Sequence, residues 1–331
     1  MQATYCAPGL NISAGTLTLA EGSKSTVSGT VTADSLTAAG TAEGSGKITV
    51  KKGADVSGSL TAGTLTLEEG SVSDVTGSVT AENLTASGTV GGSGKFAVNG
   101  KADISGEFAA ERICAKSADI SGKLAAGDAV LGNATVAEAG ALTAKSLTSA
   151  GSLGGSGKIE ASEKFTMENG SAILKGASVT AADAAVSKEA SAAADGSLSA
   201  DNLTVSGTVT GTGSITAKKA DISGSLTAGS FSARSADISG SLSAQEAVLG
   251  GSTVTGTVTA ESLTASGTIS GSGTVTAEKT FVLGGDITLG NIASLTAGTA
   301  DFGGYSAMLV NTSGSAPTVL TMTGLSSSGT D

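Results

Sequence analysis

The sequence predicts an all-β fold: an elongated, parallel β-solenoid, in which the chain winds into stacked coils with about three short strands per coil. Three observations predict it. They are a 16-residue repeat, a fixed rhythm of bulky apolar residues within that repeat, and a composition suited to a thin core. Each coil would rest on the one before it through parallel strand pairing.

The repeat is clearest at Ala220–Gly251, where two consecutive blocks both open with ADISG, the first at Ala220 and the second at Ala236. Bulky residues there are spaced four, five and seven positions apart, and the rhythm then begins again. Neither one face of a helix nor a single long strand has this spacing. A chain that turns three corners per coil has it, because each side then places one bulky residue in a shared interior. These residues are Ile222, Leu226, Phe231 and Ile238.

The same rhythm recurs along the chain. VSGTVTADSLTAAGT begins at Val27, and close variants begin at Val75 and Val254. A longer duplication relates Ala102–Asn133 to Ala220–Gly251. Solenoids tolerate such copying because each coil contacts only its neighbours. The expected core residues are Val27, Val31, Leu36, Val56, Leu60, Leu65, Val75, Val79, Leu84, Ile104, Phe108, Ile113, Ile222, Leu226, Phe231 and Ile238.

The composition also favours a thin core. The chain has 50 Gly, 2 Pro, no Trp, no His and only 2% aromatic residues. Aromatic rings fill thick cores, so Ala, Val, Leu and Ile would fill a narrow one here. Intrinsic disorder is the other interpretation of so much Gly, Ser and Thr. A hydrophobic fraction of 39% and a charged fraction of 14% oppose it.

The chain divides into three parts on these patterns. Residues 1–13 break the repeat and would form an N-terminal cap or lead-in, which protects the edge of the first coil. Residues 14–280 form the repetitive β-solenoid, with an irregular excursion at about 164–195. The Ala-rich stretch Ala181–Ala194 within it suits a short helix or an outward loop. Residues 281–331 form divergent C-terminal coils or an assembly end.

Net charge narrows the range of partners. The chain carries −11, with 18 Lys and Arg against 29 Asp and Glu. This opposes binding to nucleic acid or to an anionic membrane surface. No apolar run is long enough for a transmembrane segment. Met1 is not followed by an export signal, so either the protein stays inside the cell or the numbering begins after a removed leader, and we expect the second.

The residue types of the sequence do not support catalysis or metal binding. Without histidine, Ser-His-Asp and Cys-His catalysis and His-ligated metals are excluded. We therefore predict no catalytic residue, no cofactor and no metal site. The acidic pair Glu68–Glu69 stands at an expected turn, where a solvated corner is the better interpretation than acid–base work.

Two motifs have a structural and a functional interpretation. Gly44–Lys47 (GSGK) resembles the tail of a phosphate loop, but the motif recurs at Gly155–Lys158 and ends again at Lys95, which favours repeated turns. N-x-S/T sequences, which are glycosylation acceptors in secreted proteins, are interpreted mainly as turn or ladder asparagines. They begin at Asn11, Asn83, Asn133, Asn202 and Asn311.

The two cysteines, Cys6 and Cys114, stand far apart in the chain. Their spacing indicates neither a disulfide framework nor a metal site. In a solenoid the two positions would lie several coils apart, beyond the reach of a disulfide. We expect two unrelated thiols.

The sequence patterns of the expected strands resemble those of a known class of surface protein. Strands rich in Thr, Ser, Gly and Ala, with xLTAxG and TLTLxEG wording, and the FVLGGDITLG segment from Phe281 are similar to the passenger region of bacterial autotransporters and related adhesins. The resemblance covers most of the chain, and it rests on the general character of the strand sequences rather than on a signature motif. It implies a secreted β-helix that projects from the cell and contacts other surfaces.

A second resemblance concerns the coil pattern. Lys51–Gly70 and Ala102–Gly122 resemble the coils of bactofilins, with acid-Ile/Val-Ser-Gly corners. This implies a right-handed β-solenoid that polymerises end to end into filaments. The present chain is longer than a typical bactofilin core. No catalytic residue transfers from either family.

Taken with these resemblances, the sequence predicts a non-enzymatic structural surface protein. It would be a rigid extracellular β-solenoid on the bacterial cell surface, acting as a fibre subunit, stalk or adhesin. The expected partners are further copies of the chain, joined end to end, and surface or glycan contacts. The alternative is a bactofilin-like, self-polymerising scaffold in the cytoplasm. A polysaccharide-degrading β-helix is disfavoured because its carboxylate cluster is missing.

Overall fold

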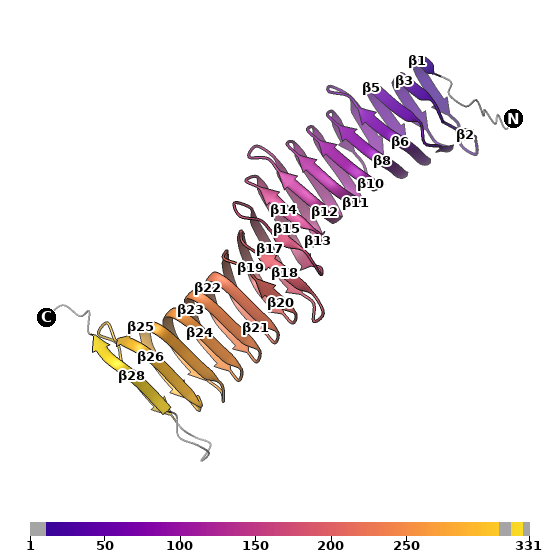
Figure 1. Cartoon of the computed structure of the whole chain (residues 1–331). Helices are drawn as coiled ribbons and strands as arrows, with labels where there is room; N and C mark the ends of the chain where they lie inside the picture. The colour runs from indigo at the N-terminus through magenta and orange to yellow at the C-terminus, as the bar shows by residue number, and fades with distance from the viewer. Residues whose placement is uncertain (1–10, 311–318, 327–331) are drawn as a thin grey trace. The chain divides into compact units, whose positions relative to one another are not determined.

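The computed structural model describes residues 11–310 and 319–326. These residues form β-strands and no helix, and the strands pair in parallel. The expected all-β, parallel β-solenoid with stacked coils is therefore confirmed (Figure 1). The chain forms two compact units, residues 1–163 and residues 164–331, which are described separately below.

Strands of the first unit follow one another with short connections (Figure 1). They are β1 (Ile12–Leu19), β2 (Lys24–Thr26), β3 (Thr30–Ala38), β4 (Thr41–Glu43), β5 (Lys47–Val56), β6 (Ser59–Leu67), β7 (Val72–Val75), β8 (Ser78–Ala86), β9 (Thr89–Gly91), β10 (Lys95–Ile104), β11 (Glu107–Ile120), β12 (Lys123–Val136), β13 (Ala141–Ser149), β14 (Ser152–Gly155) and β15 (Lys158–Met167), which contains the boundary between the units.

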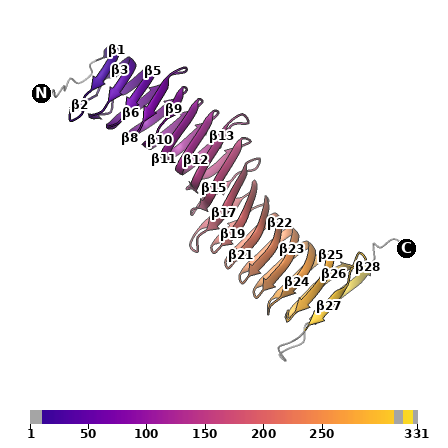
Figure 2. The same ribbon diagram turned by 180° about the vertical axis from the view of Figure 1, so that it is seen from behind.

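The second unit continues in the same style, as the view from behind also shows (Figure 2). Its strands are β16 (Ala172–Ile173), β17 (Ser178–Val186), β18 (Ser191–Ala194), β19 (Ser197–Val205), β20 (Thr208–Thr210), β21 (Ser214–Ile222), β22 (Ser225–Ile238), β23 (Ser241–Val254), β24 (Thr257–Ser270), β25 (Thr274–Gly290), β26 (Ser294–Asp301), β27 (Ala307–Val310) and β28 (Val319–Ser326).

The sequence repeat has the length of one coil. In the second unit, β21 pairs with β22 so that Ala220 lies beside Ala236 and Ile222 beside Ile238. The two ADISG copies thus stack directly on each other. Other coils are longer, as in the first unit, where Ser59 pairs with Ser78. The stack accommodates these differences because the extra residues lie in the turns.

Several strands are longer than the short strands expected. β22 and β23 have 14 residues each, and β25 has 17. Their burial still alternates with a period of two on each side of a bend. Backbone pairing therefore continues through some corners rather than ending at each one.

The core of each unit is a column of stacked apolar side chains. Every residue expected in the core is buried except Val27, which is half buried. Val27 lies between β2 and β3, in the first coil of the described residues, whose strands β1 and β2 pair with a coil on one side only. Val27 is therefore covered by described residues from one side.

Glycine at the corners lets one coil approach the next. A Cβ atom on Gly240 would lie 1.9 Å from the carbonyl oxygen of Gly224, and one on Gly256 would lie 1.9 Å from that of Gly240. No side chain fits in either place. These glycines are the last residues of the ISG and VTG motifs. The corners expected from the sequence are therefore fixed by the close approach of one backbone to the next.

The irregular excursion expected at about 164–195 is wrong for its Ala-rich half. Ala181–Ala194 contains no helix, since β17 and β18 occupy it and pair in parallel with β19 and β20. Buried residues in β17 alternate with exposed or half-buried ones. Stacking on an adjacent coil therefore overrides the local helical propensity of alanine.

The expected boundaries of the solenoid, after residue 13 and before residue 281, can each be compared with a strand of the structure. β1 begins at Ile12, inside the expected lead-in of residues 1–13, whose first ten residues lie outside the described part of the chain. The expected boundary at residue 281 falls inside β25, and coils continue beyond it through β26 and β27. A role for residues 281–331 in assembly stays a prediction.

Candidate functional site

A surface groove of about 540 Å³ lies on the second unit. It crosses equivalent positions of five successive coils, on β19, β21, β22, β23 and β24. Pairing aligns these positions, because Ala200, Ala217, Ala233, Leu249 and Ala265 lie beside one another in that order. The groove therefore runs along the direction in which the coils stack.

One wall of the groove carries a column of hydroxyl groups. Ser199 pairs with Thr216, and Thr216 pairs with Ser232. The next residue in this column is Val248, whose side chain is 44% exposed. The wall thus changes from polar to apolar along its length.

Charged side chains stand at the corner beside this wall. The ammonium nitrogen Nζ of Lys218 lies 2.6 Å from Oδ1 of Asp201, so these two charges are paired. Arg234 occupies the next coil, also lines the groove, and makes no ion pair with any of the described residues. The groove therefore holds two cations and one carboxylate.

The corner beyond Arg234 has no side chains. Gly250 and Gly251 line the groove there. A Cβ atom on Gly250 would lie 1.9 Å from the carbonyl oxygen of Arg234, so this position cannot carry one. Above Gly251 the space is open, with the nearest atom 3.9 Å from a Cβ position. The groove wall at this corner is therefore formed by backbone, with open space over Gly251.

The second unit also presents two extended rows of hydroxyl groups. Two columns of hydroxyl side chains run in register over β22, β23, β24, β25 and β26. Ser241 Oγ donates a hydrogen bond of 3.0 Å to Ser225 Oγ within one column. The columns are Ser225, Ser241, Thr257, Thr274 and Ser294, and Thr227, Ser243, Thr259, Thr276 and Thr296.

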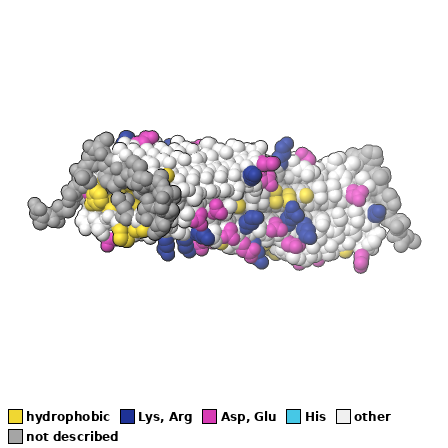
Figure 3. Space-filling view, turned by 90° about the horizontal axis from the view of Figure 1, so that it is seen from below, with side chains coloured by type: hydrophobic (Ala, Val, Ile, Leu, Met, Phe, Trp, Pro, Cys, Tyr) yellow, Lys and Arg dark blue, Asp and Glu magenta, His cyan; other side chains and the backbone are white. Residues whose placement is uncertain are grey.

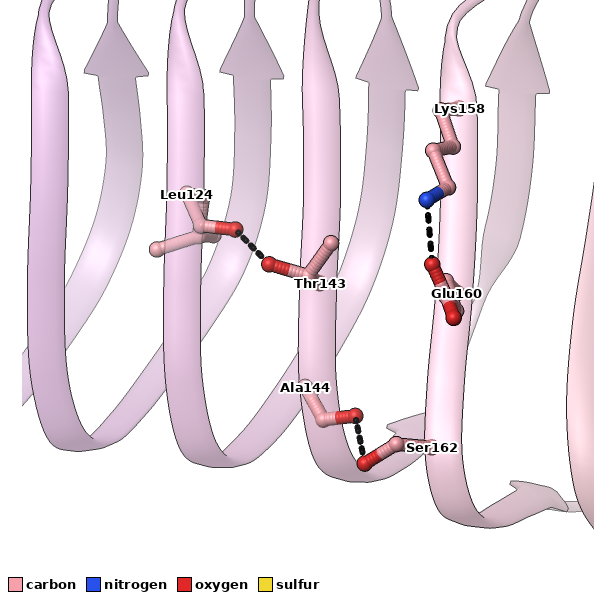
Figure 4. A network of polar contacts seen from close by, with 6 residues as sticks. All are labelled: Leu124, Thr143, Ala144, Lys158, Glu160 and Ser162. Atoms are coloured by element: carbon pink, nitrogen blue, oxygen red, sulfur yellow. Dashed lines mark hydrogen bonds and ion pairs between the residues drawn. The ribbon is translucent and has the colours of Figure 1, made fainter.

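In the first unit, polar groups on β12, β13 and β15 form a local network (Figure 4). Thr143 Oγ1 donates to the carbonyl of Leu124 at 3.3 Å, and Ser162 Oγ donates to that of Ala144 at 3.5 Å. Lys158 forms an ion pair with Glu160 on the same strand. Each of these groups binds another part of the solenoid, so the network supports the stack.

Charged side chains of both signs are intermixed on the surface shown in Figure 3. Most pairs in the first unit join neighbouring coils, such as Lys123 Nζ with Glu107 Oε1 at 2.7 Å and Lys101 Nζ with Asp119 Oδ2 at 2.6 Å. A hydrogen bond from Lys123, together with its charge, lowers the pKa of Glu107. Asp119 in the same way raises the pKa of Lys101.

The phosphate-loop-like motif is a turn, as the repeat indicated. Gly44 and Gly155 have positive φ angles of 143° and 94°. A Cβ atom on either would lie 1.9 Å from a valine carbonyl of the coil before. Glu68 and Glu69 also lie at a turn, which the amide of Ser71 closes by donating to the carbonyl of Glu68 at 3.0 Å.

The ladder interpretation of the sequon asparagines is confirmed wherever they are described. Oδ1 of Asn11, Asn83 and Asn133 each accepts a backbone N–H of the next coil, at 3.3, 3.2 and 3.0 Å. Asn202 Nδ2 instead donates to Asp183 Oδ1 at 2.7 Å. Asn311 lies outside the described residues.

Sequence reasoning missed that aspartate performs the same task. Asp195 Oδ1 accepts the backbone N–H of Thr212 at 2.9 Å, and Asp286 Oδ1 accepts that of Ser306 at 2.9 Å. Thr212 and Ser306 lie just before β21 and β27, in the coil that follows each acid.

Cys114 is a free, half-buried thiol, and Cys6 lies outside the described residues. Pairing places Cys114 beside Ala97 on one coil and Val130 on the other. On its own strand, a hydrogen bond with Cys114 raises the pKa of Arg112. The expectation that the two thiols are unrelated stays a prediction.

Two broader findings concern the described part of the chain. No group of three or more His, Cys, Asp or Glu side chains there is placed to hold a metal ion. It also contains no helix that is long and apolar enough to cross a bilayer. Comparison with protein-family models, with curated proteins and with solved structures finds no match for this chain.

The groove was also not foreseen from the sequence. The sequence feature that indicates the groove is a set of three dipeptides that lie in register on three successive coils. They are Ala217–Lys218, Ala233–Arg234 and Leu249–Gly250. Reading the sequence in coils shows a basic residue followed, one coil later, by glycine. The size of the hollow depends on how the coils stack, which the sequence pattern does not contain.

Proposed function

We propose that this protein is a non-enzymatic structural surface protein, a rigid extracellular β-solenoid that serves as a fibre subunit, stalk or adhesin. The observation that carries the proposal is the parallel pairing of each coil with the next within each unit, as between β21, β22 and β23. Each coil is held by backbone hydrogen bonds and by a buried column of apolar residues. Such stacking resists bending within a unit, which a stalk or fibre needs.

The outer surface supports contact rather than catalysis. The two hydroxyl columns of the second unit extend over β22 to β26 and carry no charge. Hydroxyl groups at regular spacing can form many weak hydrogen bonds with another surface. Multiple weak contacts of this kind suit an adhesin, whose binding grows with the number of sites engaged.

The test is the location of the full chain in the cells that produce it. Protease treatment of intact cells, followed by blotting, should remove the protein while leaving a cytoplasmic marker intact. Protection until the cells are lysed would overturn the surface function. Recovery in the cytosolic fraction alone would have the same meaning.

A bactofilin-like scaffold is the second candidate. Its support is the bactofilin-like wording of Lys51–Gly70 and Ala102–Gly122, together with the regular register of β11 with β12, which spans both strands without a bulge. Negative-stain images of the purified full chain distinguish the two candidates when combined with fractionation. End-to-end filaments from a cytosolic protein would favour the scaffold.

A further inference from the structure

We infer that the groove of the second unit binds an acidic glycan, a sugar chain bearing carboxylate or sulfate groups, with Arg234 pairing to an acidic group. The inference rests on the proposed surface function, because an extracellular protein meets such polymers on cells and in matrices. It adds the ligand class and the residues that would recognise it.

The shape of the groove suits a linear chain. Its lining comes from five successive coils, and coils stack about 4.8 Å apart, so its length is about 19 Å. That length matches several linked sugar rings rather than one small molecule. A volume of about 540 Å³ lies within the range of ligand-binding sites.

The cation in the groove is available for a ligand. Lys218 is already neutralised by Asp201 at 2.6 Å, whereas Arg234 is exposed and pairs with no carboxylate of the described residues. A guanidinium group forms two parallel hydrogen bonds with a carboxylate or sulfate. The space over Gly251, which also lines the groove, provides room for such a group.

The rest of the lining matches the surface of a sugar. The hydroxyl groups of Ser199, Thr216 and Ser232 offer donors and acceptors at the coil spacing. Val248 is 44% exposed and offers an apolar contact for the C–H face of a ring. Sugars present both kinds of surface, so the mixed wall fits them.

Peptides and nucleic acids fit the groove less well. The lining strands β21, β22 and β23 each pair on both sides with other coils, so no free strand edge remains for an added peptide strand. A nucleic acid would need aromatic side chains on which its bases could stack, and the groove lining contains none.

The same corner arrangement occurs in the duplicated block of the first unit. Lys116 and Gly132 occupy the places that Arg234 and Gly250 take in the second copy. A Cβ atom on Gly132 would lie 2.1 Å from the carbonyl oxygen of Lys116, so this corner is also without a side chain. Lys116 forms no ion pair with the described residues either. Both copies of the block therefore place a cation beside a corner that carries no side chain.

The experiment measures binding of the full chain to three polysaccharides by affinity electrophoresis and calorimetry. The probes are polygalacturonate, which carries carboxylates, heparin, which carries sulfates, and neutral dextran. We expect binding to one or both acidic probes and none to dextran, with affinity falling as salt rises. Binding to polygalacturonate alone assigns a carboxylate ligand, and binding to heparin alone assigns a sulfated one.

Two variants and one control locate the binding in the groove. Arg234→Gln should weaken binding about three- to tenfold, the range of an exposed charged hydrogen bond. Gly251→Gln should abolish it, because the new side chain has space to fold and would fill the hollow. Lys219→Gln removes the same charge from a residue outside the groove lining and should change little.

Absence of binding to both acidic probes would overturn the inference, as would equal binding to polyglutamate, an acidic polymer without sugar rings that serves as a further probe. An equal loss of binding in the Lys219 and Arg234 variants would also overturn it. So would unchanged binding by a folded Gly251→Gln protein. Circular dichroism identifies variants that do not fold, for which Gly251→Ser is the substitute. Failure here leaves protease accessibility on intact cells unchanged, so it is distinguishable from failure of the surface function.

Discussion

The phenyl rings of Phe96 and Phe108 meet edge to face in the core of the first unit, with centroids 4.7 Å apart and planes at 66°. They come from the successive strands β10 and β11, and each is 2% exposed. Aromatic pairs favour this geometry because the positive edge of one ring faces the negative face of the other. In a chain with few aromatic residues, the pair fills the core at this level of the stack.

Removing one of these rings should leave a cavity that the stack cannot close. Phe108→Ala should lower the free energy of unfolding by about 3–5 kcal/mol, because backbone pairing holds the coils apart at fixed spacing. Urea denaturation followed by circular dichroism measures it. Phe108→Leu is the matched control and should cost clearly less. Equal losses for the two variants would contradict this account of the core.

Corner glycines should tolerate no side chain where coils touch. Gly240→Ala would place Cβ 1.9 Å from the carbonyl oxygen of Gly224, and should cost more than about 1 kcal/mol. Gly251→Ala is the control, since its Cβ meets nothing closer than 3.9 Å. Thermal melting should show a lower Tm for the first variant and little change for the second. A neutral Gly240→Ala would disprove the close approach.

The ladder asparagines should protect a backbone amide of the next coil. Asn83→Ala removes the acceptor of the Lys101 N–H and should cost about 0.5–1.5 kcal/mol. Asn83→Asp keeps an oxygen acceptor at that position while it also removes the glycosylation sequon. Hydrogen exchange at the Lys101 amide should be faster in the Ala variant than in the Asp variant. Equal exchange in both would contradict the ladder.

Acid should weaken the connection between Asp286 and Ser306. The backbone N–H of Ser306, and then its hydroxyl, donate to Asp286 and lower its pKa. The folded chain thus takes up this proton less readily than the unfolded chain. The resulting stability is present above the unfolded pKa and is lost as pH falls through the folded pKa.

Asp286→Asn isolates this effect, because its amide oxygen still accepts hydrogen bonds but does not titrate. The difference in Tm between wild type and variant should shrink as pH falls through the acid range. The Tm of each protein between about pH 2 and pH 6, a range that extends well below the ordinary pKa of aspartate, provides the measurement. A difference that stays constant over that range would show that the carboxylate charge contributes nothing.

Part of the candidate site follows from the sequence once it is read in coils. The repeat shows the N-x-S/T asparagines, the GSG turns and the basic residue Arg234 within Ala233–Ser235. What the repeat does not show is which neighbour stands above each of them. Arg234 has Lys218 and Gly250 at its place in the two adjacent coils, so no carboxylate stands there, whereas Lys218 is neutralised by Asp201.

The sequence by itself determined the parallel solenoid and its register. The recurrence of ADISG places Ala220 beside Ala236 and Ile222 beside Ile238, because identical residues of adjacent coils face the same interior. Only the tertiary structure decided that Ala181–Ala194 forms strands, that Val27 is half covered, and that a groove opens beside Arg234. The physical reason is that coil stacking overrides local propensity, and that exposure at each corner depends on side chains one coil away.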